Sequence, residues 1–374
     1  MSANKKTLRV GIVVGEHSGD LLGSELVKSL KNENDTDIEL FGIGGPKLSK
    51  LGLKSEFNFK KINVMGLVEP LKNFRELNKL RKNLISLFAD KKIDYFIGVD
   101  SPDFNITIHK QLKKNGLTKN IQLVSPSVWV WRQNRLKHIR NFIDMTICLF
   151  NFEHEFYQKE NLKSIHLGHP FSHLEKGNRQ VICNKYNLSA DRHYVSILPG
   201  SRKSEINNLL PTYIDFIKEH SEKYSNYEYL IPAVDSSSMK DIKSMVPPSL
   251  PIHVHKNCSN EFLSVSDYSI VTSGTATLEA AVLSCNPIIC YKTSFINYAI
   301  ISRMLKIDNV GLPNLLLGSR IFPELIQSDC NKQNLMKEAE KMQQGFCLDD
   351  YALKLQNLLL GEGFQETAKT IRRL

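Results

Sequence analysis

The 374-residue chain lacks the features that direct a protein into or across a membrane. The apolar run near its N-terminus is too short for a signal peptide and has no small-residue cleavage site. No stretch of about 18 apolar residues occurs, so a transmembrane helix is not expected. The seven cysteines are odd in number and form no C-x-x-C pair, which favours a reduced, cytoplasmic interior.

The commonest nucleotide-binding and metal-binding signatures are missing too. No G-x-G-x-x-G follows a strand and no G-x-x-x-x-G-K-[ST] occurs, which argues against dinucleotide-binding and P-loop proteins. His253 and His255 alternate along one expected strand without a third ligand nearby. We therefore predict no metal site and no cofactor.

The net charge of +10 comes from one part of the chain. Residues 51–150 carry 18 Lys and Arg against 8 Asp and Glu, whereas the charges before and after this segment balance. Such an excess is typical of a protein that meets nucleic acid, a phosphate-bearing substrate or an anionic lipid surface. No base-stacking module accompanies it, so nucleic acid is not expected. A solvated basic face without a partner is the alternative.

Strand-like runs alternate with helical stretches in both halves of the chain. The length exceeds one typical core, and 41% hydrophobic with 24% charged residues is an ordinary globular composition. The alternation predicts an α/β fold with two parallel sheets, each covered by helices on both faces. A polar, Pro- and Gly-containing stretch interrupts it near residue 170. We predict domains at 1–170 and 171–345 facing across a cleft, and a helical tail at 346–374.

Two loops in the first half carry carboxylates directly after strand-like runs. The stretch "VVGEHSGDLLGSEL" (13–26) contains Glu16, which we expect to face the cleft, and Asp20, which we expect to cap the following helix. Asp100 ends the run "IDYFIGVD", where it is either a general base or a turn residue. Asp103 is predicted to be a helix cap. Ligands collect at the carboxyl ends of parallel strands, so both loops are candidate sites.

Two loops in the second half are suited to an anion. In "ILPGSRKSEI" (197–206), Ser201 and Arg202 lie between a strand and a helix, where helix amides and a guanidinium attract phosphate. The segment "VTSGTATLEAAV" (271–282) repeats this arrangement, and its Glu279 carboxylate can accept hydrogen bonds from ribose hydroxyls. The hydroxyls and amides offered to a diphosphate there belong to Ser273, Gly274, Thr275 and Thr277. Each loop alone is also explained as a capped helix after a Gly turn.

Two apolar and basic segments are open to two interpretations. In "SPSVWVWRQNRLKHIR" (125–140), Trp129 and Trp131 precede a run of basic residues that begins with Arg132. Residues 64–88 place leucines at helical spacing among lysines and arginines. Both segments suit a membrane interface or a phosphate-bearing lipid. Core packing is the alternative for both.

Taken together, the motifs resemble those of the lipid-A-disaccharide synthases over most of the chain. Their order and spacing match, and the combination is highly specific. The matching motifs are "GEHSGDLLG" (15–23), "VMGLVEPL" (64–71), "GVDSPDFN" (98–105), "VSPSVWVWRQNRLKHI" (124–139), "LGHP" (167–170), "LPGSRKSEI" (198–206), "SGTATLEAA" (273–281) and "LPNLL" (312–316).

The resemblance implies a GT-B fold, with two Rossmann-like domains around a cleft. It implies transfer of 2,3-diacylglucosamine from UDP-2,3-diacylglucosamine to 2,3-diacylglucosamine 1-phosphate (lipid X), with inversion and without a metal. The products are a β-1,6-linked disaccharide 1-phosphate and UDP. The family acts in lipid A synthesis of Gram-negative bacteria, at the cytoplasmic face of the inner membrane. In some members the helical tail crosses back to the first domain or exchanges between subunits, so a tail on the first domain and a homodimer are both expectations.

The resemblance also assigns roles to residues. UDP is expected on the second domain, with Asn314 of "LPNLL" added to the anion-binding residues above. Asp100 is the expected general base, and Glu16 orients the acceptor or shares that role. Ser18, Trp129 and Arg132 are candidates for acceptor or membrane contact. The family usually has Thr or a small residue where His17 stands, and because His titrates near neutral pH, His17 is a third candidate base.

Two other functions stay open at this stage. Another metal-independent GT-B transferase or a UDP-sugar epimerase would share the nucleotide-binding half, but need not share "PSVWVWRQ" or the basic first domain. A membrane-surface binding protein with degenerate sites is the second alternative. The presence of Asp100, Arg202 and Glu279 argues against it, because degeneration is expected to remove such residues.

Overall fold

The computed structural model describes residues 7–33, 36–57, 70–116, 118–126, 135–292, 309–344 and 349–374, apart from the side chains of 70–74 and 349–350. The chain forms two compact units. The first comprises Met1–His169 with Leu359–Leu374, and the second comprises Pro170–Leu358. No helix within the described ranges has the length and apolarity that crossing a bilayer requires.

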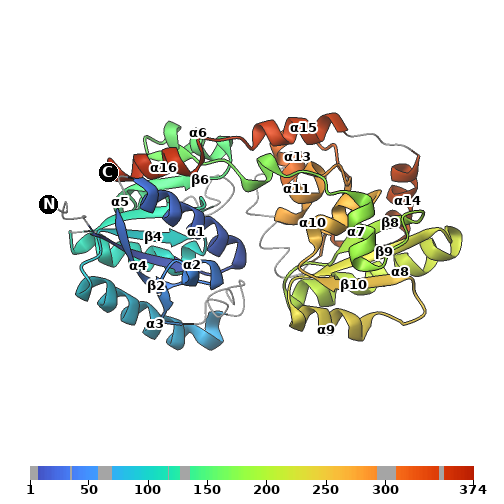
Figure 1. Ribbon diagram of the computed structural model, residues 1–374, viewed down its shortest axis with the longest axis horizontal. Helices are drawn as coiled ribbons and strands as arrows, with labels where there is room; N and C mark the ends of the chain where they lie inside the picture. The colour runs from blue at the N-terminus through green and yellow to red at the C-terminus, as the bar shows by residue number, and fades with distance from the viewer. Residues whose placement is uncertain are drawn as a thin grey trace. The chain divides into compact units, whose positions relative to one another are not determined.

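The first unit is an α/β sandwich around one parallel sheet (Figure 1). Its strands are β1 (Thr7–Val14), β2 (Asp37–Ile43), β3 (Lys54–Ser55), β4 (Tyr95–Val99), β5 (Lys119–Leu123), β6 (Met145–Cys148) and β7 (Ser164–His166). Its helices are α1 (His17–Asn32), α2 (Pro46–Lys50), α3 (Pro70–Asp90), α4 (Pro102–Lys114), α5 (Arg135–Phe142), α6 (Asn151–Lys159) and α16 (Gly363–Arg372).

The order of the first sheet is β3-β2-β1-β4-β5-β6-β7, with every pairing parallel. The adjacent strands β1 and β4 are mostly apolar and buried, as expected for a parallel sheet with helices on both faces. After β1, the chain adds β2 and β3 on one side of it. The chain then crosses back and adds β4, β5, β6 and β7 in order on the other side. The carboxyl ends of β1 and β4 therefore form the topological switch point, where α/β sheets bind their ligands.

The C-terminal segment completes the first unit. Helix α16 packs against α1, and the Arg372 guanidinium donates to the Leu30 carbonyl at 2.8 Å. The segment just before α16 passes very close to Gly168, whose φ is 86°. A Cβ on Gly168 would lie only 2.6 Å from the Gly361 nitrogen. The two glycines thus permit the crossing. The predicted tail 346–374 is divided in the structure, because α15 (Asp349–Leu358) belongs to the second unit.

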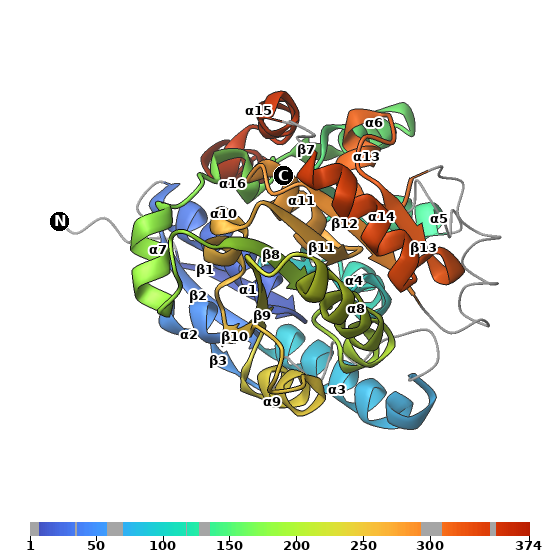
Figure 2. The same ribbon diagram turned by 90° about the vertical axis from the view of Figure 1, so that its right-hand side faces the viewer.

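The second unit repeats the architecture (Figure 2). Its strands are β8 (His193–Leu198), β9 (Tyr227–Ala233), β10 (Ile252–Lys256), β11 (Tyr268–Thr272), β12 (Pro287–Tyr291) and β13 (Glu324–Ile326). Its helices include η3 (Pro170–His173), α7 (Arg179–Tyr186), α8 (Lys203–Lys223), α9 (Ser236–Met245), α10 (Ser259–Val265), α11 (Thr275–Val282), α13 (Leu312–Leu317), η4 (Gln327–Asp329), α14 (Lys332–Gln343) and α15. The strand order β10-β9-β8-β11-β12-β13 puts this sheet's switch point between β8 and β11.

Asp20 does not have the predicted role. Helix α1 begins at His17, so Asp20 lies inside its first turn and is 1% exposed. Its carboxylate accepts hydrogen bonds from the backbone amides of Gly45, Lys47 and Leu48, at 2.8, 2.8 and 3.2 Å. Asp20 therefore caps the neighbouring helix α2 rather than its own helix, and its carboxylate has a structural role.

Candidate active site

Glu16 and Asp100 lie at the switch point of the first sheet. Val14 at the end of β1 is the register partner of Val99 at the end of β4, so the residues that follow them leave the sheet side by side. Glu16 is the N-cap residue of α1, but its side chain does not cap the helix. His17 and Ser18, in the first turn of α1, are exposed. The sheet thus brings together the three candidate bases of the sequence.

The backbone at Asp100 has an unusual conformation. Asp100 and Ser101 have φ angles of 49° and 41°, in the left-handed region that residues other than Gly rarely adopt. Val124, which follows the adjacent strand β5, has a φ of 69°. A β-branched residue is especially rare there. Backbone strain of this kind is found preferentially at functional sites, which supports Asp100 as one.

Asp103 is not the predicted cap, because Ser101 is the N-cap residue of α4 and Asp103 lies in its first turn. The Asp103 carboxylate forms an ion pair with Arg135. Arg81, which is 9% exposed, donates to the Asp103 backbone carbonyl at 3.1 Å. Burial lowers the pKa of the Arg81 guanidinium, although Asp103 opposes this effect. Two guanidinium groups therefore lie beside the start of α4, one turn from Asp100.

The two loops of the second half that are predicted to bind an anion meet at the switch point of the second sheet. Leu198 at the end of β8 is the register partner of Val271 in β11, so the loops that follow are neighbours. Ser201 and Arg202 precede α8, and Gly274 and Thr275 begin α11; all four are exposed. The N-cap residue of α11 is Gly274, which has no side chain that could cap the helix. The start of α11 is thus a candidate anion site, with the Arg202 guanidinium on the neighbouring loop.

Glu205 is a further residue at this loop, which the sequence motifs did not indicate. Its Oε2 accepts hydrogen bonds from the backbone amides of Ser201 and Arg202 at 3.0 and 3.1 Å, and its Oε1 lies 3.3 Å from the Arg202 guanidinium. A Cβ on Gly200 would lie 2.4 Å from this carboxylate, so glycine is required there. Glu205 is the third residue after the N-cap, and this capping-box spacing was the available signal.

The side chains of three other predicted residues form hydrogen bonds within the second unit. Thr277 is 0% exposed, and its hydroxyl donates to the Gly274 carbonyl at 2.8 Å. The Ser273 hydroxyl donates to the Val310 carbonyl at 3.2 Å. Asn314 is also 0% exposed, and its amide makes four hydrogen bonds within the unit, to Ile321, Phe322 and Glu324. These three side chains therefore stabilise the conformation of the loops.

Among the described carboxylates of the second unit, Glu279 has the pKa that departs most from its ordinary value. Desolvation raises its pKa to about 7, and a hydrogen bond from the Ser259 hydroxyl at 3.3 Å opposes the shift. It lies in the second turn of α11, near the exposed helix start. A carboxylate with this pKa changes charge in the neutral range, so it can make ligand binding depend on pH.

Some predicted residues fall outside the described ranges. Trp129 and Arg132 do so, and the first turn of α3 has no described side chains. Further along α3, Leu77 and Leu80 are 5% and 8% exposed and pack in the core of the first unit. For these two leucines the core-packing alternative is correct. Among the described residues, no three His, Cys, Asp or Glu side chains come together as metal ligands.

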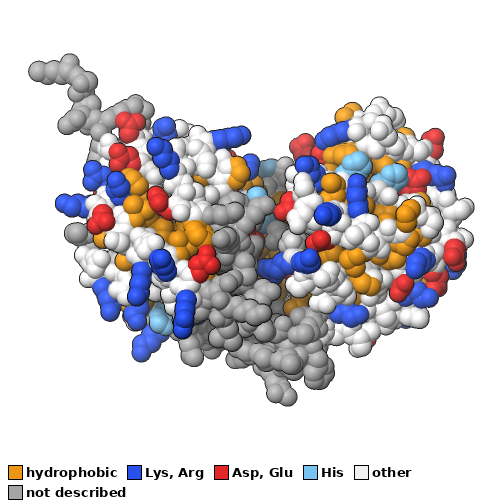
Figure 3. Space-filling model, turned by 90° about the horizontal axis from the view of Figure 1, so that it is seen from below, with side chains coloured by type: hydrophobic (Ala, Val, Ile, Leu, Met, Phe, Trp, Pro, Cys, Tyr) orange, Lys and Arg blue, Asp and Glu red, His pale blue; other side chains and the backbone are white. Residues whose placement is uncertain are grey.

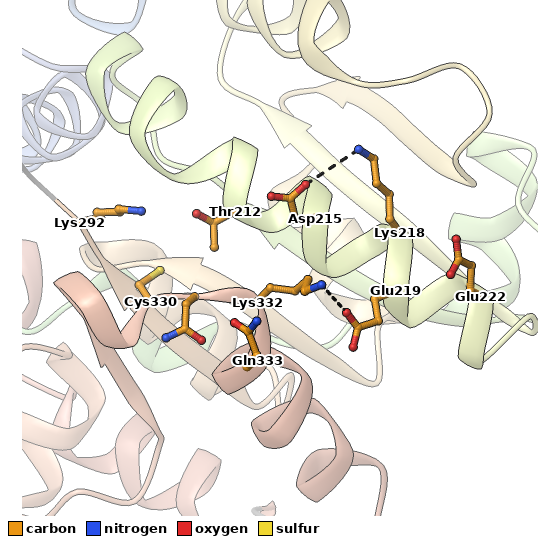
Figure 4. Close-up of a pocket in the computed structure, with 10 residues that line it drawn as sticks. Thr212, Asp215, Lys218, Glu219, Glu222, Lys292, Cys330, Lys332 and Gln333 are labelled. Atoms are coloured by element: carbon orange, nitrogen blue, oxygen red, sulfur yellow. Dashed lines mark ion pairs between the residues drawn. The ribbon is translucent and has the colours of Figure 1, made fainter.

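A groove of about 650 Å³ lies elsewhere on the second unit, between α8 and α14 (Figure 4). Lys332 forms an ion pair with Glu219 at 2.7 Å, and Lys218 lies 3.9 Å from Asp215. None of the predicted site residues lines this groove. The candidate site is therefore defined by the strand ends and not by this groove.

Two Rossmann-like units, each with its candidate residues at a switch point, define a protein of the GT-B class. Solved structures agree. The UDP-GlcNAc 2-epimerase from Neisseria meningitidis bound to UDP-GlcNAc matches with a TM-score of 0.64, 12% identity and coverage of 98% of this chain and 99% of that one. Acinetobacter baumannii MurG matches with a TM-score of 0.53, 12% identity and coverage of 99% and 100%. At these identities the likeness shows the fold alone.

The sequence comparisons are more specific than the fold. The family model of lipid-A-disaccharide synthetase matches residues 10–357, so the chain belongs to this family. The lipid-A-disaccharide synthase of Acinetobacter baylyi is 38% identical over 349 residues, covering 90% of this chain and 88% of the relative. That of Wigglesworthia glossinidia brevipalpis is 38% identical over 339 residues, covering 89% and 88%. Membership makes the chain a glycosyltransferase.

Proposed function

We propose that this glycosyltransferase transfers 2,3-diacylglucosamine from its UDP donor to the 6-hydroxyl of 2,3-diacylglucosamine 1-phosphate. The products are the β-1,6-linked disaccharide 1-phosphate and UDP. Family membership over residues 10–357 is the observation that carries the proposal. The candidate residues at both switch points support it, since the reaction needs one site for a nucleotide sugar and one for an acceptor hydroxyl.

The second unit is the proposed donor site. The diphosphate binds the exposed amides at the start of α11 and the Arg202 guanidinium, and Glu279 accepts hydrogen bonds from the ribose. Charge develops on UDP as it leaves, and fixed amides, helix dipoles and a guanidinium stabilise that charge without reorganisation. The Glu205 carboxylate occupies the amides of Ser201 and Arg202, so it holds Arg202 beside the loop.

The first unit is the proposed acceptor site, with Asp100 as general base. Inversion requires one direct attack of the acceptor hydroxyl on the anomeric carbon. A carboxylate within hydrogen-bond reach of that hydroxyl removes its proton in the transition state. Glu16, at the neighbouring strand end, orients the acceptor sugar. Arg81 and Arg135 at the start of α4 supply positive charge for the acceptor phosphate.

The test is an assay with both lipid substrates, with and without a chelator, followed by mass spectrometry of the products. Formation of the disaccharide 1-phosphate and UDP in both conditions is the expected result. Activity lost on chelation would contradict metal independence. Epimerisation of UDP-GlcNAc without any disaccharide would favour the alternative that the fold shares with the Neisseria meningitidis structure.

We expect Glu279 to make donor binding depend on pH. Its pKa is about 7, so UDP affinity should rise as pH increases through 7 and level off about one unit higher, because an ionised carboxylate accepts stronger hydrogen bonds from ribose. Titration calorimetry with the wild type and with Glu279→Gln isolates this group, since the ionisation of UDP is common to both. An equal pH dependence in the two proteins would remove Glu279 from the ribose site.

The Glu279 carboxylate should also make the free energy of unfolding smaller as pH rises. Its pKa is above the ordinary value of 4.5, so the folded ligand-free protein binds more protons than the unfolded chain between about pH 4.5 and 7. The free energy of unfolding contributed by Glu279 therefore falls over that window and is constant above it. Denaturant unfolding should show that the stability of the wild type relative to Glu279→Gln falls between about pH 4.5 and 7. A difference that does not change with pH would contradict the assignment.

Membrane contact is proposed for the basic side of the first unit. Lys and Arg side chains gather at the lower left of this unit in Figure 3. Helices α4 and α5 pack together and carry exposed basic residues, including Lys114 and Lys137. Each basic residue near an anionic membrane surface contributes about 1 kcal/mol to attraction. The acceptor is itself a lipid, so this surface would bring the enzyme to its substrate.

The protein should bind phosphatidylglycerol-containing vesicles at low ionic strength and be released as salt rises above about 0.15 M, where the screening length falls to about 8 Å. Lys114→Glu combined with Lys137→Glu should reduce sedimentation with vesicles several-fold. The matched control, Lys240→Glu with Lys243→Glu, makes the same charge change on exposed residues of α9. Equal effects of the two pairs would favour a solvated basic face.

A further inference from the structure

A buried glutamine joins the ends of two strands next to Asp100. Gln122 lies in β5 and is 1% exposed. Its Nε2 lies 3.2 Å from each of three backbone carbonyls, those of Asp100, Leu123 and Val124. Asn105 in α4, which is 0% exposed, donates its Nδ2 to the same Asp100 carbonyl at 2.8 Å. Two buried amides therefore converge on the peptide that follows the proposed base.

These bonds lie where the backbone is strained. Asp100 and Ser101 are left-handed, and so is Val124 at the end of the neighbouring strand. A residue with a Cβ loses about 1–2 kcal/mol in this conformation. The conformation persists only where the surrounding structure holds it, and the Gln122 and Asn105 amides hold the carbonyl of Asp100. The Asp100 amide is held as well, because it donates to the Leu123 carbonyl at 2.9 Å.

A buried histidine contacts the other end of the glutamine amide. His109 is 0% exposed, and its Nε2 lies 3.2 Å from Gln122 Oε1. That oxygen can only accept, so the proton of the imidazole is on Nε2. Burial lowers the pKa of His109 to about 4, which keeps the ring neutral at physiological pH. The three carbonyls can only accept, so they fix Gln122 Nε2 on their side and leave Oε1 facing His109.

His109 is itself fixed by its surroundings. It packs edge-on against Phe96, with ring centroids 4.7 Å apart. A Cβ on Gly98 would lie 2.9 Å from His109 Nε2, so the ring rests directly on β4. The Asn120 Nδ2 donates to the His109 carbonyl at 2.8 Å. The network is therefore rigid from the helix to the strand end.

We propose that Gln122 and Asn105 are positioning residues for Asp100, with His109 packed against the oxygen of the Gln122 amide. The inference rests on the proposed role of Asp100 as the base. Two donors on one carbonyl fix the plane of the Asp100–Ser101 peptide and hence the direction of the Asp100 Cα–Cβ bond. Without them the strained turn relaxes toward an ordinary conformation and the carboxylate moves from the acceptor hydroxyl.

The first test is Gln122→Met, which keeps the length of the side chain and removes both donors. We expect kcat to fall about 10- to 100-fold, the cost of a displacement of about 1 Å at a reacting group. UDP affinity should stay within twofold, since UDP binds the other unit. Thr146→Val is the matched control, because Thr146 is 1% exposed in the adjacent strand β6 and the change is isosteric. Its kcat should be that of the wild type.

The second test asks whether Gln122 acts through Asp100. In the Asp100→Asn background, Gln122→Met should change the residual turnover less than twofold, because effects on one catalytic group are not additive. A full-sized loss in that background, or an unchanged kcat in the single variant, would overturn the inference. Asn105→Leu removes the other donor and replaces Gln122→Met in both tests if that variant unfolds.

The outcomes separate this inference from the proposed function. Near wild-type turnover in Asp100→Asn alone would show that Asp100 is not the base, whatever Gln122 does. A large loss in Asp100→Asn together with normal turnover in both Gln122→Met and Asn105→Leu would leave Asp100 as the base and refute its positioning by these amides.

Discussion

Replacing Asp100 with alanine is expected to reduce turnover about 10²- to 10⁴-fold, the range that general base catalysis contributes. UDP binding should change little, because the proposed donor site lies on the second unit. The acceptor hydroxyl would then have to lose its proton to water in the transition state. Disaccharide formation under saturating substrates and calorimetry with UDP measure the two effects separately.

The conformation of Asp100 makes Asp100→Asn the cleaner variant. Its φ of 49° disfavours alanine, whereas asparagine adopts left-handed conformations several-fold more often than most residues. Asn keeps the shape and removes the base, so both variants should lose activity. Glu16→Gln should lose less, and His17→Ala should stay near wild type. Near wild-type turnover in Asp100→Asn, with a large loss in His17→Ala, would move the base to His17.

Arg202→Ala is expected to reduce kcat/KM for the UDP donor about 10- to 100-fold. Hydrogen bonds to charged groups contribute about 1.5–3 kcal/mol, and this one strengthens as charge develops on the departing diphosphate. Arg202→Lys keeps the charge but loses the planar fork, so it should recover only part of the loss. Steady-state kinetics with varied donor concentration give the result.

Lys203→Ala is the matched control for Arg202. Lys203 is the next residue, is exposed, and lies 3.8 Å from Asp241 in a surface ion pair. Because surface ion pairs contribute little, its donor kinetics should be those of the wild type. Equal losses in both variants would indicate a general effect of positive charge, and unchanged kinetics in Arg202→Ala would remove the diphosphate site as proposed.

Local patterns were sufficient for the class of fold. Strand-like runs followed by Gly-containing turns and helices predicted parallel α/β units, and the structure has two. The loops at Glu16, Asp100, Arg202 and Gly274 were recognisable because each directly follows a buried strand. The motifs also identified the family, which the comparisons confirm.

Capping was harder to predict than strands. A carboxylate near a helix start can cap its own helix or bind any amide that the fold brings close. Asp20 caps α2, which is 25 or more residues away in the chain, and Asp103 pairs with Arg135. Asn314 and Thr277 belong to motifs that match the family, yet their side chains are buried beneath the loops. Local sequence does not contain these contacts.

The contact between Gln122 and Asp100 could not be predicted from sequence motifs. A glutamine in the run "IQLVSP" carries no catalytic signature, and the available signal was a polar side chain in a sheet that helices were predicted to cover on both faces. Its importance depends on β5 pairing with β4, because that pairing puts Gln122 beside the Asp100 carbonyl.

The sequence by itself determined the two α/β units, the family and the loops that carry the candidate residues, because these depend on short-range periodicity and on motifs. Only the tertiary structure decided which loops are neighbours, since strand order brings β1 beside β4 and β8 beside β11. It also decided which polar groups are buried and which carboxylates the fold uses. Those outcomes depend on contacts between residues far apart in the chain, where desolvation and hydrogen-bond geometry act.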